Sequence, residues 1–345
     1  MKILVANHSL KQAGGTETFT YTLIGELKKR KHEIEYFCFE KGEYSDRIEQ
    51  DYGISFKRSE KYDLILANHH TTVKALRKTG FIVQTCHGIF PALEQPSKFA
   101  DGLVSISQEV QYHLLRKGFK SLIIHNGVDC TRYKPIKPLR ETQPKVLSLC
   151  HSEDAHKIVQ QACKSLNLGF SILDKYIDKA WAVEKIINEH DIVVGLGRSA
   201  YEALACGRPV IIFDKRKYGI GQGDGYFLYN ILEGLKHNCS GRSLRIEFTQ
   251  ENLIKELIKY NPKHGQIARD YALQTFNITK TTDEYFEFLY YLSQDIHRKS
   301  FKARFLRLIR LVLILLPEQI KSPLRKIDKS LGGRFLKIKR SFIPR

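Results

Sequence analysis

The segment 191–214, with the sequence DIVVGLGRSAYEALACGRPVIIFD, constrains the fold of this chain more than any other stretch. It begins with an apolar run at 192–194, breaks at two glycines, continues as a helix-forming stretch from Ser199, and ends in a second apolar run at 210–213. This order predicts a strand, a loop, a helix and a second strand of an α/β sheet. In such sheets ligands bind at the carboxyl ends of the strands, where loops lead into helices. The segment therefore also predicts where a polar site lies.

Two charged side chains, Arg198 and Glu202, fall at this predicted binding edge. An arginine and a helix N-terminus both suit phosphate oxygens, so the pair indicates an anionic ligand. Each residue also has a purely structural interpretation. Ser199 and Glu202 have the spacing of a capping box, in which the Glu side chain accepts a hydrogen bond from the backbone N–H of the Ser, and Arg198 can be an ordinary surface charge. The local pattern leaves both interpretations open.

The segment resembles the donor-site region of the GT-B glycosyltransferases, particularly the large retaining family 4. Three further stretches match this family in order along the chain: the glycine loop GGTE at 14–17, His87-Gly88 after an apolar run, and NGVD at 126–129. Together the matches cover roughly residues 1–295. The residues that fit the family's G-x-G loop, its helix with a Glu, and its A-x-A/C-G-x-P-V pattern are Gly195, Gly197, Glu202, Ala203, Cys206, Gly207, Pro209 and Val210.

The resemblance implies an α/β protein of two Rossmann-like, doubly wound parallel-sheet domains that face a cleft. We expect an acceptor-side domain at 1–138, a nucleotide-sugar donor domain with a crossing helix at 139–297, and a basic amphipathic helical tail at 298–345. The glycine-rich stretch 219–225 is expected to be an irregular loop. The predicted strands are 3–6, 33–39, 64–67, 81–85, 103–105, 122–124, 146–149, 170–173, 192–194 and 210–213, and helices are expected at about 155–167, 181–189, 251–260 and 283–293.

The family also implies roles for individual residues. His87 is the expected catalytic residue, which steadies developing charge or binds a sugar hydroxyl, unless it is a packed loop histidine. Glu202 is expected to bind the donor ribose, and Arg198 the diphosphate. The full expected donor-binding set is Gly14, Gly15, Gly195, Gly197, Arg198, Ser199, Glu202 and, as a weaker member, Lys157.

The chain departs from the family in two places. The family usually carries a second Glu eight residues before Glu202, where this chain has Val194. The stretch 145–157 also lacks the Arg and Gly that usually open the second domain. Arg198 is the candidate replacement for the missing phosphate-binding cation.

The expected activity is hexosyl transfer, with retention, from a nucleotide sugar to a lipid-linked or cell-surface glycan, as in polysaccharide or lipopolysaccharide biosynthesis. A nucleotide-sugar epimerase and a non-catalytic binding protein with this fold remain open alternatives. No cofactor and no metal are expected, because the chain has no D-x-D motif and the adjacent His69 and His70 would point to opposite faces of a strand. The seven scattered cysteines have no zinc spacing and indicate reduced thiols.

The last 48 residues carry most of the net charge. Residues 298–345 hold 15 Lys and Arg against two acids, a net +13 of the chain's +19. On a helix, one face of the first part is apolar and the opposite face is basic, as in segments that lie in a membrane interface. We therefore expect a cytoplasmic, peripheral protein on the inner face of an anionic membrane. The residues expected to contact lipid are Phe301, Lys302, Phe305, Arg307, Leu308, Arg310 and Val312.

The tail has two other interpretations, as a helix packed on the protein and as a nucleic-acid-binding segment. A helix packed on the protein with a solvated basic face remains open. Nucleic acid is not expected as a partner, because no stacking surface or reader motif accompanies the charge. The start of the chain runs directly into a predicted strand, with no apolar signal core, which favours the cytoplasm.

Overall fold

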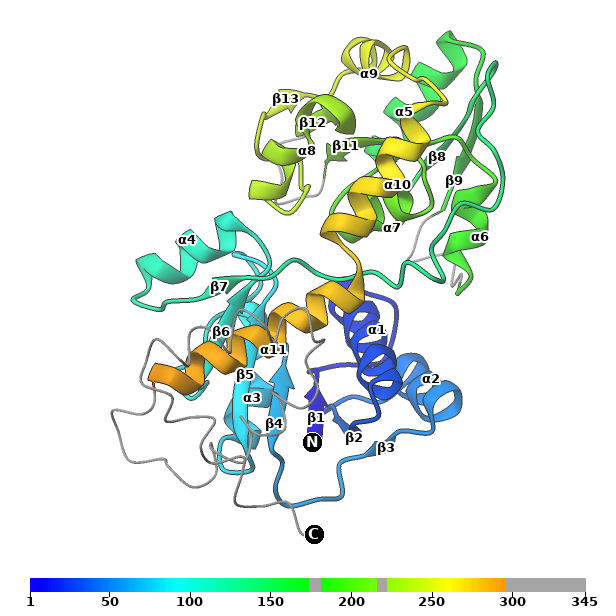
Figure 1. Ribbon diagram of the computed structural model, residues 1–345. Helices are drawn as coiled ribbons and strands as arrows, with labels where there is room; N and C mark the ends of the chain where they lie inside the picture. The colour runs from blue at the N-terminus through cyan, green and yellow to red at the C-terminus, as the bar shows by residue number, and fades with distance from the viewer. Residues whose placement is uncertain (174–180, 216–221, 296–345) are drawn as a thin grey trace, which may run out of the picture. The chain divides into compact units, whose positions relative to one another are not determined.

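The computed structural model describes residues 1–173, 181–215 and 222–295 (Figure 1). The chain divides into two compact units, one of Lys2–Thr282 and one of Met1 with Asp283–Arg345. Both sheets lie in the unit Lys2–Thr282.

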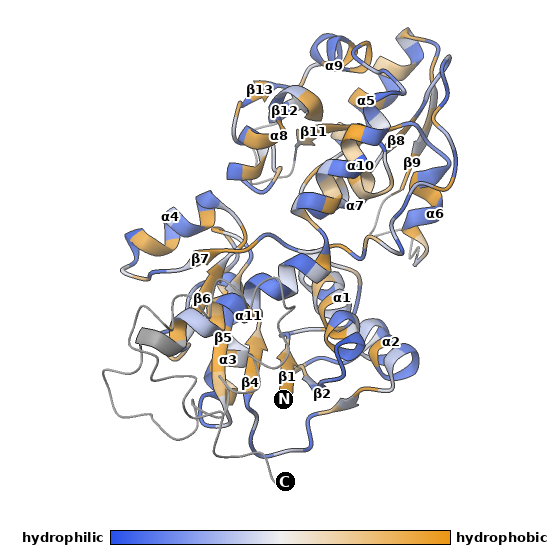
Figure 2. Ribbon diagram, viewed as in Figure 1, coloured by the Kyte–Doolittle hydropathy of each residue, from blue (hydrophilic) through white to orange (hydrophobic). Residues whose placement is uncertain are grey.

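The first sheet has seven strands, all paired in parallel, in the order β3-β2-β1-β4-β5-β6-β7 (Figure 1). Its central strands are apolar on both faces, as parallel strands covered by helices must be (Figure 2). The strands are β1 (Lys2–Ala6), β2 (Glu33–Phe37), β3 (Ser55–Phe56), β4 (Leu64–Ala67), β5 (Phe81–Cys86), β6 (Gly102–Ser105) and β7 (Leu122–Ile123), and the helices between them are α1 (Gly15–Lys29), α2 (Glu43–Tyr52), α3 (His70–Leu76), the 3-10 turn η1 (Ala92–Glu94) and α4 (Gln108–Arg116).

The second sheet has six strands in the order β13-β12-β11-β10-β8-β9. The four strands β9, β8, β10 and β11 pair in parallel. β12 runs antiparallel to both of its neighbours, β11 and the edge strand β13. The strands are β8 (Lys145–Ser148), β9 (Gly169–Ile172), β10 (Ile192–Gly195), β11 (Val210–Asp214), β12 (Gln222–Tyr226) and β13 (Ile246–Glu247), and the helices are α5 (Glu153–Ser165), α6 (Val183–Asn188), α7 (Arg198–Ala205), α8 (Phe227–Lys236), α9 (Gln250–Leu257), α10 (His264–Thr275) and α11 (Ile278–Asp295).

The predicted α/β architecture of two sheets is therefore confirmed, and the predicted strands and helices agree with the structure to within a few residues at their ends. The two sheets fall on either side of residue 138, although that domain boundary stays a prediction. The predicted helix at 283–293 is part of α11, and its crossing role also stays a prediction.

The expectation of an irregular loop at 219–225 was wrong for its second half, because β12 begins at Gln222. Two glycines make this strand possible. A Cβ on Gly223 would lie 2.1 Å from the Phe248 ring, and Gly225 has a φ of +76°. The pairing with β11 shifts register between Ile212 and Phe213, as at a β-bulge.

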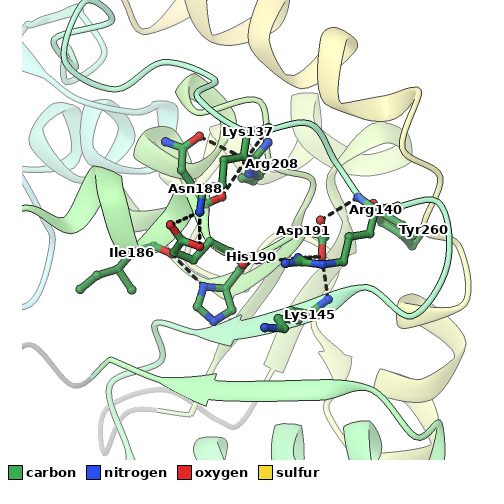
Figure 3. A network of polar contacts seen from close by, with 10 residues as sticks. Lys137, Arg140, Lys145, Ile186, Asn188, His190, Asp191, Arg208 and Tyr260 are labelled. Carbon is green, nitrogen blue, oxygen red and sulfur yellow. Dashed lines mark hydrogen bonds and ion pairs between the residues drawn. The ribbon is translucent and has the colours of Figure 1, made fainter.

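A buried polar network ties the connection between the two sheets to the second sheet (Figure 3). The Asp191 carboxylate accepts hydrogen bonds from the backbone N–H groups of Arg140 and Lys145, and from the Arg140 guanidinium. The fully buried Arg208 donates to the carbonyl of Lys137 and to both the carbonyl and the side chain of Asn188. The arginine of the G-R-P-V stretch therefore has a structural role.

Candidate functional site

A pocket with a volume of about 330 Å³ lies at the carboxyl ends of strands from both sheets. Four of the segments that line it directly follow a strand: 13–16 after β1, 87–91 after β5, 149–151 after β8, and 196–199 after β10. This is the edge at which α/β sheets bind ligands, because the loops there lead into helix N-termini.

The structure brings most of the predicted site residues together around this pocket. Those that line it are Gly14, Gly15, His87, Gly197, Arg198, Ser199 and Glu202. Gly195 ends β10 and does not line the pocket. A Cβ added at this position would lie 3.3 Å from the Leu149 side chain. Lys157 also lies outside the pocket wall, where it forms an exposed ion pair with Glu153 at 2.7 Å.

Several pocket residues were not predicted from the sequence. Arg132, Arg242, Tyr133 and Trp181 line the pocket, and so does Asn126. Asn126 belongs to the NGVD segment that carried the resemblance, which was a usable signal. The two arginines and Tyr133 lie in stretches without a recognisable motif, so nothing local distinguished them.

Helix α7 begins two residues earlier than the capping-box interpretation requires. Its N-cap is Gly197, which has a φ of +55°, and no side chain of the described residues caps it. The Gly197 N–H bonds to the carbonyl of Cys239, which fixes the chain for an early helix start. Ser199 is therefore inside the helix and Glu202 is too far along to bond to the cap, so the predicted capping box was wrong. The uncapped first turn faces the pocket through Gly197, Arg198 and Ser199.

Glu202 instead pairs with Arg198, one helical turn earlier. The Arg198 Nε donates to Glu202 Oε1 at 2.8 Å, and both side chains are only 9% exposed. Burial raises the pKa of the Glu202 carboxyl above its usual value, and the charge and hydrogen bond of Arg198 oppose this rise. Tyr133 adds a hydrogen bond that also favours the ionised form.

His87 lies at the end of β5 and is held by two amide side chains. Its Nε2 lies 3.0 Å from Asn68 Oδ1, and its Nδ1 lies 3.3 Å from Asn126 Nδ2. Burial, together with the nearby His69 and Arg198, lowers the pKa of His87 to about 3. The imidazole is therefore neutral near pH 7.

The direction of the hydrogen bonds sets the tautomer of this ring. The Thr20 hydroxyl donates to the carbonyl of Thr16, so it accepts from Asn68 Nδ2. Asn68 then presents its Oδ1 to His87, which must donate from Nε2. The unprotonated Nδ1 faces Asn126, which donates to it. His87 is thus a fixed, neutral ring in the site, and both of its nitrogens form hydrogen bonds with amide side chains.

Two more arginines in the pocket wall are held by carboxylates. Arg132 pairs with Glu184 at 3.0 Å, and its guanidinium lies over the Trp181 ring, 4.7 Å from the centroid. Arg242 makes a two-pronged pair with Glu109 through Nε and Nη2, at 3.0 and 2.6 Å. The pocket is therefore rich in guanidinium groups at fixed positions.

The described residues contain no group of three or more His, Cys, Asp or Glu side chains that could hold a metal ion. All seven cysteines lie in the described part of the chain, and each is buried and forms no disulfide. The absence of a metal requirement stays a prediction.

No protein-family model and no curated protein matches the chain. Solved structures do. Anabaena HepE (Alr3699), solved with UDP and glucose, is 17% identical over 84% of this chain and 99% of HepE, with a TM-score of 0.57. A glycosyltransferase from Rickettsia africae ESF-5 is 13% identical over 83% of this chain and 97% of its own, with a TM-score of 0.56. An alpha-glucosyltransferase solved with UDP and a 13-mer DNA is 12% identical over 83% and 98%, with a TM-score of 0.51.

These likenesses establish the fold. The chain has the two-sheet GT-B fold of nucleotide-sugar glycosyltransferases, as the resemblance implied. The match spans nearly the whole of each neighbour, so both sheets are included. Membership of the retaining family 4 stays a prediction.

Proposed function

We propose that this protein is a glycosyltransferase that takes a sugar from a nucleotide-sugar donor. One observation carries the proposal: the uncapped N-terminus of α7 lies in the wall of a pocket that also holds the Glu202 carboxylate and three arginines. A helix N-terminus suits a diphosphate, and a carboxylate suits the hydroxyls of a ribose. That HepE was solved with UDP and glucose supports this choice of ligand.

In this proposal the chain supplies positioning and electrostatic stabilisation. The backbone N–H groups at the start of α7 bind the diphosphate, and Glu202 accepts the ribose hydroxyls. The loop at Gly14 and Gly15 gives backbone access to the donor and the acceptor. With retention, the leaving diphosphate takes the proton of the acceptor hydroxyl on the same face of the sugar, so no separate base is required.

Two residues refine this mechanism. Val194 is fully buried within β10, so no carboxylate stands where the family usually has its first Glu. The neutral His87 ring is poorly suited to carry a proton near pH 7, because its pKa is lowered to about 3. We assign it the role of a fixed polar group beside the reacting sugar.

We further propose that the acceptor is a lipid-linked or cell-surface glycan and that the basic tail holds the protein on an anionic membrane. The support is the sequence of 298–345, with its apolar and basic faces and its net charge of +13. The expected lipid contacts, Phe301 to Val312, lie outside the described residues. Among the residues that are described, no helix is long and apolar enough to cross a bilayer. We propose no nucleic-acid partner.

The proposal is tested by a thermal-shift screen of the purified protein against nucleoside diphosphates, followed by a hydrolysis assay with the matching nucleotide sugars. Ligands that bind only the folded state raise the melting temperature. We expect one base to raise it by a few degrees, and inorganic phosphate at the same concentration to have no such effect.

The alternatives give different results in the same assays. A non-catalytic binding protein would be stabilised by the nucleotide without any turnover. An epimerase would change the stereochemistry of the donor sugar without an acceptor. If no nucleoside diphosphate stabilises the protein, the proposed function is wrong.

A further inference from the structure

All three nitrogens of the Arg198 guanidinium donate hydrogen bonds to other groups of the protein. Nε donates to Glu202 Oε1 at 2.8 Å, Nη1 to the carbonyl of Gly127 at 2.9 Å, and Nη2 to Thr22 Oγ1 at 3.1 Å. These acceptors belong to α7, to the segment that follows β7, and to α1. The Thr22 hydroxyl is itself fixed, because it donates to the carbonyl of Thr18. Arg198 is thus held in one orientation by three parts of the chain that are distant in sequence.

The same contacts determine the state of Glu202. A buried carboxylate without a cationic partner tends to become protonated, and a protonated carboxyl loses acceptor capacity. Arg198 supplies the largest opposing charge and a hydrogen bond, Arg132 adds a smaller opposing charge, and Tyr133 supplies a second donor. An ionised carboxylate has about four acceptor positions, so it retains capacity for ligand hydroxyls on the side that lines the pocket.

We propose that Arg198 is a positioning residue, which holds the Glu202 carboxylate ionised and oriented as the acceptor for the ribose hydroxyls, rather than a ligand of the diphosphate. The proposal rests on the proposed function, since it takes Glu202 as the ribose contact. It also explains why an arginine stands at the first position of α7: from there its side chain reaches Glu202 one turn later and Thr22 on α1. The diphosphate is then left to the backbone N–H groups at the start of the helix.

The two roles predict different ligand selectivity. A positioning residue acts through the ribose, so its loss weakens the binding of a nucleoside and of the corresponding diphosphate by the same factor. A phosphate ligand acts on the diphosphate alone, so its loss leaves the nucleoside unaffected. Removal of the ribose 2′-hydroxyl provides a second test, because only a protein with a correctly held Glu202 discriminates strongly against the deoxy compound.

The test is isothermal titration of the full chain with uridine, UDP and 2′-deoxy-UDP, and with the matching guanosine and adenosine compounds. Arg198→Met removes the charge and the hydrogen bonds at similar side-chain length, and Glu202→Gln is the reference variant. For the base that binds, we expect Arg198→Met to lower the affinity for the nucleoside and for the diphosphate equally, by roughly 10- to 100-fold, as for a lost charged hydrogen bond. Its preference for ribose over 2′-deoxyribose should fall to the level of Glu202→Gln.

Two further variants keep the result interpretable. Arg242→Met removes an equal charge from the same pocket but leaves the partners of Glu202 in place, so the 2′-hydroxyl preference should persist. Arg198→Lys retains the charge as a single point without the planar fork. We expect it to lose much of the 2′-hydroxyl preference, whereas a phosphate ligand would be largely replaced by the lysine. If Arg198→Met does not fold, Arg198→Lys alone distinguishes a positioning role of Arg198 from diphosphate binding.

The proposal is overturned if Arg198→Met, or Arg198→Lys where Met is unfolded, weakens UDP but not uridine and keeps the 2′-hydroxyl preference. Wild-type affinities in both variants would overturn it as well. If the wild-type protein binds none of the nucleoside diphosphates, the proposed function fails first, and this inference fails with it.

Discussion

At the scale of single residues, His87 shows how burial changes what a motif can do. Its position at a strand end beside the pocket agrees with the expectation from the His-Gly motif. Its protonation does not follow from the motif. Three buried histidines have strongly lowered pKa values: His32 and His69 at about 4, and His87 at about 3. The cause in each case is mainly desolvation of the charged ring.

These histidines predict a loss of stability on the acid side. Between their ordinary pKa of 6.5 and the lowered values, the unfolded chain takes up protons that the folded chain does not. The free energy of unfolding therefore falls as the pH is lowered through this window, by up to roughly 1.4 kcal/mol per pH unit for each such group. Urea unfolding of wild type and His87→Gln from pH 7 to 4 measures the slope.

We expect His87→Gln to be less stable than wild type at pH 7, because the hydrogen bonds with Asn68 and Asn126 are disturbed, but to show a shallower dependence on pH. His69→Gln is the control for the amide contacts: it removes a buried histidine with a lowered pKa that is not placed between these two amides, so it should also flatten the slope while leaving the hydrogen bonds of His87 in place. Equal slopes in wild type and His87→Gln would show that His87 is already protonated, or not protected, in the folded state.

At the scale of elements, β12 shows what local sequence patterns do not contain. The stretch from Gln222 to Gly225 is rich in glycine, which ordinarily indicates a loop. Here the absence of a side chain lets the Phe248 ring, which stacks on Phe213, lie directly over the backbone of Gly223. By contrast, the apolar run at Leu64–Ala67 forms β4 with the predicted bounds, because its pattern is local.

Gly223→Ala should therefore destabilise the protein by about 1–3 kcal/mol, the usual cost of overpacking a core. The added Cβ would lie 2.1 Å from the Phe248 ring and 2.6 Å from the carbonyl oxygen of Ile212. Phe248→Leu in the same chain should restore part of the loss, but not the part due to the backbone contact. Chemical denaturation of the three variants measures this.

Gly15→Ala is the control for this series. Among the described residues, no atom outside its chain neighbours and its own helix backbone lies within 4 Å of the position that an added Cβ would occupy, and the residue starts α1. The stability of Gly15→Ala should therefore be close to that of wild type. A Gly223→Ala protein as stable as Gly15→Ala would mean that Phe248 moves aside freely, and that the glycine is not required by the strand.

At the scale of the whole molecule, charge is concentrated at one end of the chain. The body up to residue 297 carries a net charge of only +6, against +13 for the remaining 48 residues. Each Lys or Arg near an anionic membrane contributes about 1 kcal/mol to binding, and salt screens this attraction. We expect the apolar side chains of the tail to add burial in the interface, which salt does not screen.

A truncation after His297 should fold, bind nucleotide as the full chain does, and lose binding to anionic lipid vesicles. The double exchange of Phe305 and Leu308 for Ser should cause much of the same loss without removing any charge. Vesicle sedimentation at low and high salt is the measurement, with neutral vesicles as the control. If the truncated protein binds anionic vesicles as well as the full chain, the tail does not anchor the protein.

The sequence alone determined the α/β class, the order of most strands and helices, and the segment that lines one side of the pocket. These properties follow from local periodicity and from glycines at fixed spacing, which neighbouring residues are sufficient to express. Only the tertiary structure decided that α7 starts at Arg198, that Glu202 pairs with this arginine rather than with the helix cap, and that Thr22 and Gly127 complete the contact. Hydrogen bonds between such distant residues depend on how the sheets and helices pack, and no local pattern records that geometry.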